Sequence, residues 1–252
     1  MIKLNGQVVL ITGGSRGIGA ATAIMFARAG ANVTITYQKN EKAASGILRQ
    51  IRKLGREAIA IRCNVANFAD DKRTVTQVCK KFGRIDVLVN NAGVWTFGQV
   101  EKMSEKIWDE TINANLKGTF NMCKAVVPVM KKQKYGRIIN VSSTAGQRGE
   151  AFHSHYAASK GGVNAFTKSL GAELISKGIW VNCVAPGWVV TDMTSSDLKQ
   201  HKIKVAIEKT IPRGRIAMPE EIAGPILFLA SDLSNNIVGE ILNVNGGSVL
   251  CG

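Results

Sequence analysis

Cysteine and histidine, the residues that build disulfide frameworks and many metal sites, are scarce in this sequence of 252 residues. Its three histidines lack metal-ligand spacing, and its five cysteines are scattered, odd in number and never arranged as Cys-x-x-Cys. Neither a disulfide scaffold nor a zinc site is indicated, and we expect no metal. The cysteines are Cys63, Cys79, Cys123, Cys183 and Cys251.

Long apolar runs are absent as well, so no segment is predicted to cross a membrane. Residues 1–6 lead directly into an apolar strand, which is unlike a signal peptide, and we expect a cytoplasmic protein. Hydrophobic residues make up 45% of the chain, which favours one large α/β domain over residues 1–252.

Acidic residues are outnumbered, because 18 Asp and Glu face 33 Lys and Arg, for a formal net charge of +15. Such a charge attracts polyanions, but no arginine-rich tail or aromatic-basic motif indicates a specific nucleic acid. Local clusters of cations occur at two places, Lys131, Lys132, Lys134 and Arg137, and Lys199, Lys202, Lys204 and Lys209. These clusters are consistent with an acidic partner or substrate. Lysines and arginines on solvent-exposed helix faces would give the same sequence pattern.

A tyrosine and a lysine four residues apart stand at the start of a predicted helix. If helical, Tyr156 and Lys160 share one face, with Cβ atoms about 5–6 Å apart. A phenol has a reference pKa of about 10, and a cation about 4 Å away is worth roughly 4 kcal/mol, or about three pKa units. We therefore expect Lys160 to lower the pKa of Tyr156, although such pairs also occur by chance on helices. The helix is predicted from an apolar stripe at Val163, Phe166, Leu170 and Leu174.

The segment before this helix, residues 136–142, is a short apolar run that predicts a buried strand. Ser143 follows it directly. Because open α/β sheets bind ligands at the carboxyl ends of their strands, Ser143 is expected to lie near a ligand.

A glycine-rich turn joins the first predicted strand, residues 7–12, to the first predicted helix. It reads Gly13-Gly14-Ser15-Arg16-Gly17-Ile18-Gly19. Glycines let the backbone approach a diphosphate, and a helix N-terminus offers it free amides. The spacing differs from Gly-x-Gly-x-x-Gly, so the prediction of dinucleotide binding comes from the position of the turn between strand and helix.

Strands and helices alternate along the rest of the chain, which predicts a doubly wound, mostly parallel, seven-stranded sheet with helices on both faces. The further strands are expected at 32–37, 58–63, 86–90, 136–142, 179–185 and 241–244. The further helices are expected at 41–54, 70–82, 108–130 and 219–231, and Asn115 lies on the third of these. Asn90-Asn91-Ala92-Gly93 falls at a carboxyl edge, where it is either a ligand-binding segment or an ordinary polar turn.

In this order and spacing, the glycine turn, Asn90-Asn91-Ala92-Gly93, Ser143, Tyr156-x-x-x-Lys160 and Pro186-Gly187-x-x-x-Thr191 resemble the short-chain dehydrogenase/reductase family over essentially the whole chain. Four further segments, 185–194, 219–223, 228–232 and 243–247, most resemble bacterial 3-oxoacyl-[acyl-carrier-protein] reductases. Many relatives of other specificity share these segments.

The resemblance implies roles for four residues. Tyr156 would be the general acid in reduction and the base in oxidation, and Lys160 would lower its pKa and hold the nicotinamide ribose. Ser143 would hydrogen-bond the substrate carbonyl, and Asn115 would hold a water of a proton relay. The implied cofactor-binding residues are Gly13, Ser15, Arg16, Gly17, Ile18, Gly19, Tyr37, Gln38, Lys39, Asn64, Val65, Asn91, Ala92, Gly93, Tyr156, Lys160, Pro186, Gly187, Val189 and Thr191.

The end of the second strand indicates which nicotinamide cofactor is used. NAD-preferring sites place a carboxylate there to accept hydrogen bonds from the ribose 2′-hydroxyl, whereas this chain has Tyr37-Gln38-Lys39. Arg16 and Lys39 could instead bind a 2′-phosphate. We therefore expect NADPH, with NADH less favoured.

The sequence thus predicts an NADPH-dependent ketoreductase, acting on 3-oxoacyl thioesters or a related ketone. The alternatives are an NAD(P)-dependent dehydrogenase of a secondary alcohol, sugar or steroid, and a non-catalytic dinucleotide-sensing or nucleic-acid-binding protein. A sensor has no chemical need for a Tyr and a Lys on one helix face. We expect a homotetramer, a substrate lid around residues 188–212, and substrate-lining positions at Trp95, 147–155, Trp188 and 195–210. An acidic acyl carrier protein would contact Lys131, Lys132, Lys134, Arg137 and Lys177.

Overall fold

The structure, a computed structural model, describes residues 2–250. Seven strands form one sheet in the order β3-β2-β1-β4-β5-β6-β7, and every neighbouring pair is parallel. The predicted fold class is confirmed. The strands are β1 (Val8–Ile11), β2 (Asn32–Tyr37), β3 (Ala58–Arg62), β4 (Val87–Asn90), β5 (Gly136–Val141), β6 (Ile179–Pro186) and β7 (Ile241–Val244).

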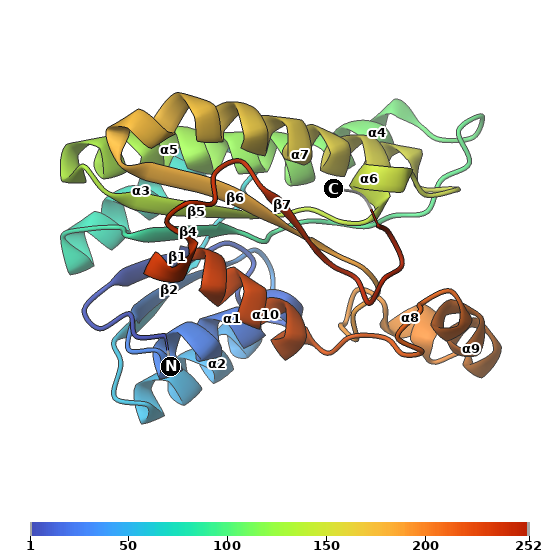
Figure 1. The fold of residues 1–252 in the computed structure, drawn as a ribbon, viewed down its shortest axis with the longest axis horizontal. Coiled ribbons are helices and arrows are strands. Elements are labelled where there is room, and N and C mark those ends of the chain that lie inside the picture. Colours follow the sequence, from blue (N-terminus) through green and yellow to red (C-terminus); the bar gives the residue numbers. More distant parts are fainter. Residues whose placement is uncertain (1, 251–252) are drawn as a thin grey trace.

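Helices cover both faces of the sheet, so its central strands are buried on both sides. All residues of β1, β4 and β5 are buried, as expected for continuous apolar runs in a parallel sheet. Figure 1 shows α3, α5 and α7 along one face and α1, α2 and α10 along the other. The helices are α1 (Gly17–Arg28), α2 (Glu41–Lys53), α3 (Phe68–Phe82), α4 (Glu105–Ile112), α5 (Gly118–Gln133), α6 (Ala145–Arg148), α7 (Ser154–Leu174), α8 (Ser195–Leu198), α9 (His201–Lys209) and α10 (Pro219–Leu229).

The strand order reverses between β1 and β4. The chain runs outward from β1 through β2 to β3, then crosses to β4 on the other side of β1. Open α/β sheets bind ligands in the crevice that this reversal leaves at the carboxyl ends of the strands. The segments that follow β1 and β4 are the glycine turn and Asn91-Ala92-Gly93.

One predicted helix differs from the structure. Residues 108–130 are not a single α-helix, because α4 ends at Ile112 and a π-helical segment, Asn113–Lys117, separates it from α5. The wider turn is closed by the Gly118 amide, which donates to the Asn113 carbonyl oxygen. Periodicity cannot reveal a π segment, because one extra residue in a turn leaves the apolar stripes on either side intact.

Arg137 corrects a second expectation. It was predicted as a surface cation, yet its side chain is only 1% exposed. Its guanidinium donates to Asp232 at 3.1 Å and to Ser234 at 3.2 Å, and lies 4.7 Å from the centre of the Trp180 ring. This arginine ties β5 to the segment after α10 and is not available to a partner.

The predicted absences concern cysteine, metal and membrane. Cys63, Cys79, Cys123 and Cys183 are free thiols, while Cys251 lies outside the described residues. Within residues 2–250, no group of three His, Cys, Asp or Glu side chains could hold a metal ion. Over the same residues, no helix is both long and apolar enough to span a membrane.

Candidate active site

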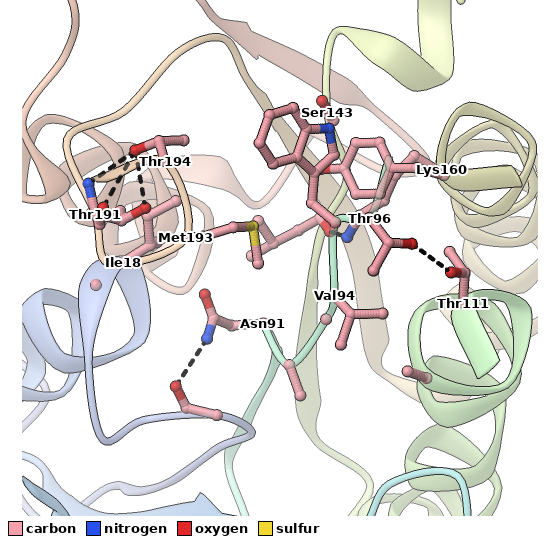
Figure 2. Close-up of a pocket in the computed structure, with 18 of the residues that line it drawn as sticks. Ile18, Asn91, Val94, Thr96, Thr111, Ser143, Lys160, Thr191, Met193 and Thr194 are labelled. Atoms are coloured by element: carbon pink, nitrogen blue, oxygen red, sulfur yellow. Dashed lines mark hydrogen bonds between the residues drawn. The ribbon is translucent and has the colours of Figure 1, made fainter. Parts of the chain in front are cut away.

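A cavity of about 1250 Å³ opens at the carboxyl ends of the central strands. The segments after β1, β2, β3, β4, β5 and β6 all contribute to its lining. Every residue of the predicted catalytic and cofactor-binding sets lies in this lining except Gly19 and Asn115. In Figure 2, Ser143 and Lys160 lie on one side of this space, and Met193 reaches toward it from the segment that carries Thr191 and Thr194.

The glycine turn is held against the segment that follows β4. Asn91 Nδ2 donates to the carbonyl oxygens of Thr12 and Gly13 at 2.9 and 3.1 Å. The Asn91 and Ala92 amides donate to Thr12 Oγ1, both at 3.0 Å. A Cβ atom on Gly19 would lie 2.5 Å from Asn91 Nδ2, so only glycine fits there. Gly19 packs against Asn91 and does not face the cavity, which explains why it is absent from the lining.

The N-terminus of α1 is open toward the cavity. Arg16 is the N-cap residue and its side chain makes no capping hydrogen bond, and no acidic residue stands in the first turn. The first amides of a helix lack intrahelical partners and carry a positive dipole end, so they favour an anion such as a diphosphate. The close-packed glycines and these free amides fit the dinucleotide that the sequence predicts.

The residues expected to bind a 2′-phosphate lie at one end of the cavity. Tyr37, Gln38 and Lys39 line it where β2 ends. Arg16 lies across from Asp192, with 3.7 Å between Nη1 and Oδ2, and both side chains are 65% exposed. Ion pairs this exposed are weak, so the guanidinium can exchange this partner for another anion.

Tyr156 and Lys160 lie one turn apart on α7 and both line the cavity. Lys160 Nζ donates to the Val141 carbonyl oxygen at 2.8 Å. Burial lowers the pKa of Lys160 to about 8 and raises the pKa of Tyr156 to about 12. A hydrogen bond with Ser143 acts to lower the pKa of Tyr156, and the Glu150 carboxylate acts to raise it.

The expected lowering of the phenol pKa by Lys160 is therefore not found in this structure. The sequence argument placed a cation beside the phenol in a solvated setting, whereas burial dominates here and the ammonium is bound to a backbone carbonyl. A phenol whose pKa is about 12 stays protonated at neutral pH. Tyr156 is thus in the form that donates a proton.

Two adjacent serines after β5 have different environments. Ser142 is buried, and its hydroxyl donates to the Lys160 carbonyl oxygen at 3.0 Å, which ties β5 to α7. Ser143 lines the cavity, accepts a hydrogen bond from the Ala145 amide at 3.1 Å and interacts with Tyr156. Ser143 and Tyr156 are therefore the hydroxyl pair that a substrate carbonyl could meet.

Asn115 is fully buried in the π-helical segment and does not line the cavity. Its side-chain amide pairs with the Val94 backbone through both Oδ1 and Nδ2, at 2.8 and 3.0 Å, and Nδ2 also donates to Ser159 Oγ at 3.0 Å. The side chain therefore fixes the segment after β4 against α7. Its predicted part in a proton relay stays a prediction.

Sequence reasoning placed Trp95, Trp188 and the segments 147–155 and 195–210 near the substrate. Trp95, Trp188 and residues 148–150 line the cavity, whereas 147, 151–155 and 195–210 do not, because these loop and lid segments carry no pattern that shows which way they face.

Sequence reasoning named no role for Thr96 or Thr111, which line the cavity too, whereas Glu150 and Met193 fall within the predicted segments 147–155 and 188–212. These two threonines lie on a loop and at a helix end, where no periodic pattern marks an inward-facing side chain. The one signal available was the closeness in sequence of Thr96 to Gly93 and of Thr111 to Asn115.

The predicted basic surface falls at two separate places. Lys131, Lys132, Lys134 and Lys177 are exposed, and Lys134 and Lys177 come just before the amino ends of β5 and β6. The cavity lies at the carboxyl ends of the same strands. This cluster is therefore at the opposite edge of the sheet, the one formed by the amino ends of the strands. Lys199, Lys202, Lys204 and Lys209 are also exposed, on and just before α9, which follows the cavity-lining residues 191–194.

Comparison with known proteins agrees with this geometry. Residues 13–248 match the sequence family described as Enoyl-(Acyl carrier protein) reductase. The 3-oxoacyl-[acyl-carrier-protein] reductase of Synechocystis sp. is 43% identical over 99% of this chain and 100% of its own length. The Thermotoga maritima 3-oxoacyl-[acyl-carrier-protein] reductase FabG is 42% identical over 99% of this chain and 100% of its own. The solved structure of a protein described as a putative short-chain alcohol dehydrogenase, from Sinorhizobium meliloti, has a TM-score of 0.94 at 31% identity, covering 98% of this chain and 97% of the other.

Proposed function

We propose that this protein, which belongs to the short-chain dehydrogenase/reductase family, is an NADPH-dependent reductase of 3-oxoacyl thioesters. Family membership makes it an NAD(P)H-dependent oxidoreductase of ketone or hydroxyl groups. The observation that carries the finer proposal is the Ser143–Tyr156 pair beside Lys160, in one cavity with the glycine turn. Relatives named 3-oxoacyl-[acyl-carrier-protein] reductase, at 41–43% identity, support the thioester substrate.

The cofactor, when bound, supplies a hydride to the keto carbon. The glycine turn and the open end of α1 would hold its diphosphate, and Arg16 and Lys39 its 2′-phosphate. Asn64 and Val65 would lie beside its adenine, and Thr191 would contact its carboxamide. Pro186, Gly187 and Val189 would line the same side.

The chain's own residues bind and protonate the substrate oxygen. Ser143 and Tyr156 donate hydrogen bonds to the keto oxygen, which stabilises the negative charge that develops there. Tyr156 then passes its phenolic proton to that oxygen, so the carbonyl becomes an alcohol and the tyrosine a phenolate. The Lys160 ammonium stabilises this phenolate until a proton from solvent restores the phenol.

An acidic acyl carrier protein is the proposed partner, in keeping with the net charge of +15. With Arg137 buried, the remaining cations of the first cluster lie at the far edge of the sheet from the cavity. The lysines on and before α9 lie closer along the chain to the cavity lining. We therefore assign first contact with the carrier to Lys199, Lys202, Lys204 and Lys209, the lysines of the proposed lid.

A homotetramer is proposed on two exposed apolar features. Trp108 on α4 and Phe120 on α5 are each more than two-fifths exposed, although both are large and apolar. β7 is an edge strand of four residues that are all half-buried. Apolar helix faces and edge strands of this kind are typical of subunit contacts. Light scattering that finds a monomer at micromolar concentration would contradict this proposal.

The test of function is a steady-state assay of reduced cofactor consumption. We expect acetoacetyl and longer 3-oxoacyl thioesters to be reduced with NADPH, and a Tyr156→Phe variant to be inactive on the same compounds. A panel of secondary alcohols, sugars and steroids with NADP⁺ and NAD⁺ tests the alternative, which the similarity to the Sinorhizobium meliloti protein favours. Efficient oxidation of that panel with no thioester reduction would overturn the proposal.

A further inference from the structure

Five ring side chains form a continuous row beside the catalytic residues. Phe152 stacks on Phe97 with ring centres 5.6 Å apart, and Phe97 meets His153 edge to face at 5.9 Å. His153 lies parallel to Trp95 at 4.4 Å, and Trp95 meets Trp188 edge to face at 5.7 Å. The chain has only four tryptophans and eight phenylalanines, and two of each are in this row. We call these five residues the aromatic wall.

The aromatic wall runs from the catalytic residues to solvent. Trp188, Trp95 and Phe97 line the same cavity as Ser143 and Tyr156. At the outer end, Phe97 is 64% exposed and Phe152 is 54% exposed. Large apolar side chains left this exposed at the mouth of a cavity are typical of a ligand-binding groove. A ligand held by Ser143 and Tyr156 could therefore continue along the wall and cover these rings.

Glu150 holds the inner part of the wall in place. It lines the cavity, and its carboxylate accepts a hydrogen bond from the Trp95 side chain, whose only donor is the indole N–H. The same carboxylate lies 3.8 Å from His153 Nδ1, on the ring that stacks on Trp95. One carboxylate thus lies beside two neighbouring rings of the wall, and the Ala151 carbonyl oxygen, 3.1 Å from His153 Nδ1, also holds the second ring.

A partly buried chain of hydrogen bonds fixes the segment that carries Trp95 and Phe97. His155 Nε2 lies 2.7 Å from Thr96 Oγ1, which lies 3.2 Å from Thr111 Oγ1, and Thr111 donates to the Ile107 carbonyl oxygen at 3.0 Å. All three contacts are hydrogen bonds only if His155 Nε2 carries a proton and donates to Thr96. His155 Nδ1 then carries none, which fits its lack of a partner among the described residues.

The outer end of the wall is fixed through the backbone. The Gly98 amide donates to the Phe152 carbonyl oxygen at 2.8 Å, which joins the two loops that carry the outer rings. Phe152 has a φ of +63°, in the left-handed region that a bulky residue rarely adopts. Strained residues of this kind persist where the surrounding structure holds them, and they gather at ligand sites.

We propose that the aromatic wall is the subsite for the group beyond the keto carbon, and that it selects 3-oxoacyl thioesters in which this group is an aromatic ring. The proposal rests on the proposed reductase function. A straight alkyl chain gains only buried area against the wall, and loses freedom about its own bonds. A ring gains similar area, is already rigid, and continues the alternation of stacked and edge-to-face contacts. The expected preference is about 10-fold in kcat/KM.

The test compares two thioesters with equal carbon numbers, 3-oxo-3-phenylpropanoyl and 3-oxononanoyl N-acetylcysteamine. The wild-type protein should reduce the phenyl compound with the higher kcat/KM. Phe97→Leu keeps an apolar side chain and removes the ring, so it should lower the phenyl-to-alkyl ratio several-fold, mainly through KM. Phe82→Leu, an equally conservative change at the end of α3 and outside the cavity lining, is the matched control and should keep the ratio.

Glu150 gives a second, independent pair of variants. Glu150→Gln retains an acceptor for the Trp95 N–H and should keep most of the phenyl-to-alkyl ratio of kcat/KM. Glu150→Ala should lose this ratio, mainly because KM for the phenyl compound rises. The wall proposal is overturned if the two thioesters are reduced equally well, or if Phe97→Leu lowers both values by the same factor. If neither thioester is reduced but the matching ethyl esters are, the thioester function is wrong and the ratio on the esters decides the role of the wall. Failure to reduce all four compounds would overturn both proposals.

Discussion

The ammonium group of Lys160 lies 5.8 Å from the centre of the Tyr156 ring. It is held there by the Val141 carbonyl oxygen and not by the phenol. The lysine is therefore positioned before any negative charge forms on the tyrosine. Lys160 therefore stabilises the tyrosine only once the phenolate forms during the reaction. Stabilisation at that stage lowers the activation barrier of the reaction.

Tyr156→Phe should lower kcat by about 10²- to 10⁴-fold, because it removes the proton donor and keeps the ring packed. Cofactor affinity, measured by fluorescence titration, should stay within a few-fold of the wild-type value. Tyr135→Phe, a half-buried tyrosine outside the cavity lining, is the matched control. Turnover by Tyr156→Phe at the wild-type rate would refute the mechanism.

Arg16→Ala should reduce the preference for NADPH over NADH by roughly 10-fold or more, because a hydrogen bond between charged groups is lost. Turnover with NADH should change little. Asp192→Asn removes the acidic neighbour of Arg16 and should lower the KM for NADPH. Arg28→Ala, an exposed arginine at the other end of α1, serves as control. A wild-type kcat/KM that is higher with NADH than with NADPH would contradict the assignment.

Lys202→Glu should lower kcat/KM for a carrier-bound 3-oxoacyl substrate on the order of 5-fold at low salt, because rim charges steer association. Added salt should lower the wild-type value with this substrate and narrow the difference. A small ketone ester should show neither effect. Lys134→Glu makes the same charge reversal at the opposite edge of the sheet. An equal loss there would mean that the carrier contacts that edge, and equal losses on both substrates would remove the carrier hypothesis.

Asp71 should make the protein less stable as pH rises from about 4 to about 7. The carboxyl is fully buried, and burial raises its pKa to about 7. Among residues 2–250, only the Cys63 thiol donates a hydrogen bond to it, at 3.4 Å. Between the unfolded pKa of about 4 and the folded value, the folded state binds the extra proton, so the free energy of unfolding falls with rising pH and levels off above about 7.

Urea unfolding of wild type and Asp71→Asn at several pH values measures this effect. Asn cannot ionise, so the stability of Asp71→Asn relative to wild type should increase on the order of 3 kcal/mol between about pH 4 and about pH 7. A pH-independent loss of stability caused by the Asn side chain does not affect this change with pH. Asp109→Asn on exposed α4 is the control for a surface carboxylate. A stability difference between wild type and Asp71→Asn that does not change with pH would contradict the raised pKa.

The sequence predicted the sheet well because each strand is a compact apolar run between turn residues. The boundaries predicted for β2 match the structure, and the glycine turn lies between β1 and α1 as expected. The short helices α6, α8 and α9 were not predicted as helices, since they are too short or too exposed to show an apolar stripe.

The sequence predicted the site residues that belong to a motif. It predicted less well the properties that depend on contacts between residues distant in sequence. Ser143, Tyr156 and Lys160 meet in one cavity, as their order along the chain implied. The burial of Arg137 depends on Asp232 and Ser234, more than ninety residues away in sequence. The pKa of Tyr156 depends on burial, which spacing alone does not reveal.

The hydrogen bond from the Asn91 amide to Thr12 Oγ1 joins residues separated by 79 positions. During synthesis at about 5–20 residues per second, the glycine turn therefore waits roughly 4 to 16 s for the segment that holds it in place. Until then β1 has β2 on one side and lacks β4, its partner on the other side, in the centre of the sheet. A nascent chain halted before Asn91 would carry every glycine of the turn and still be unable to bind a dinucleotide.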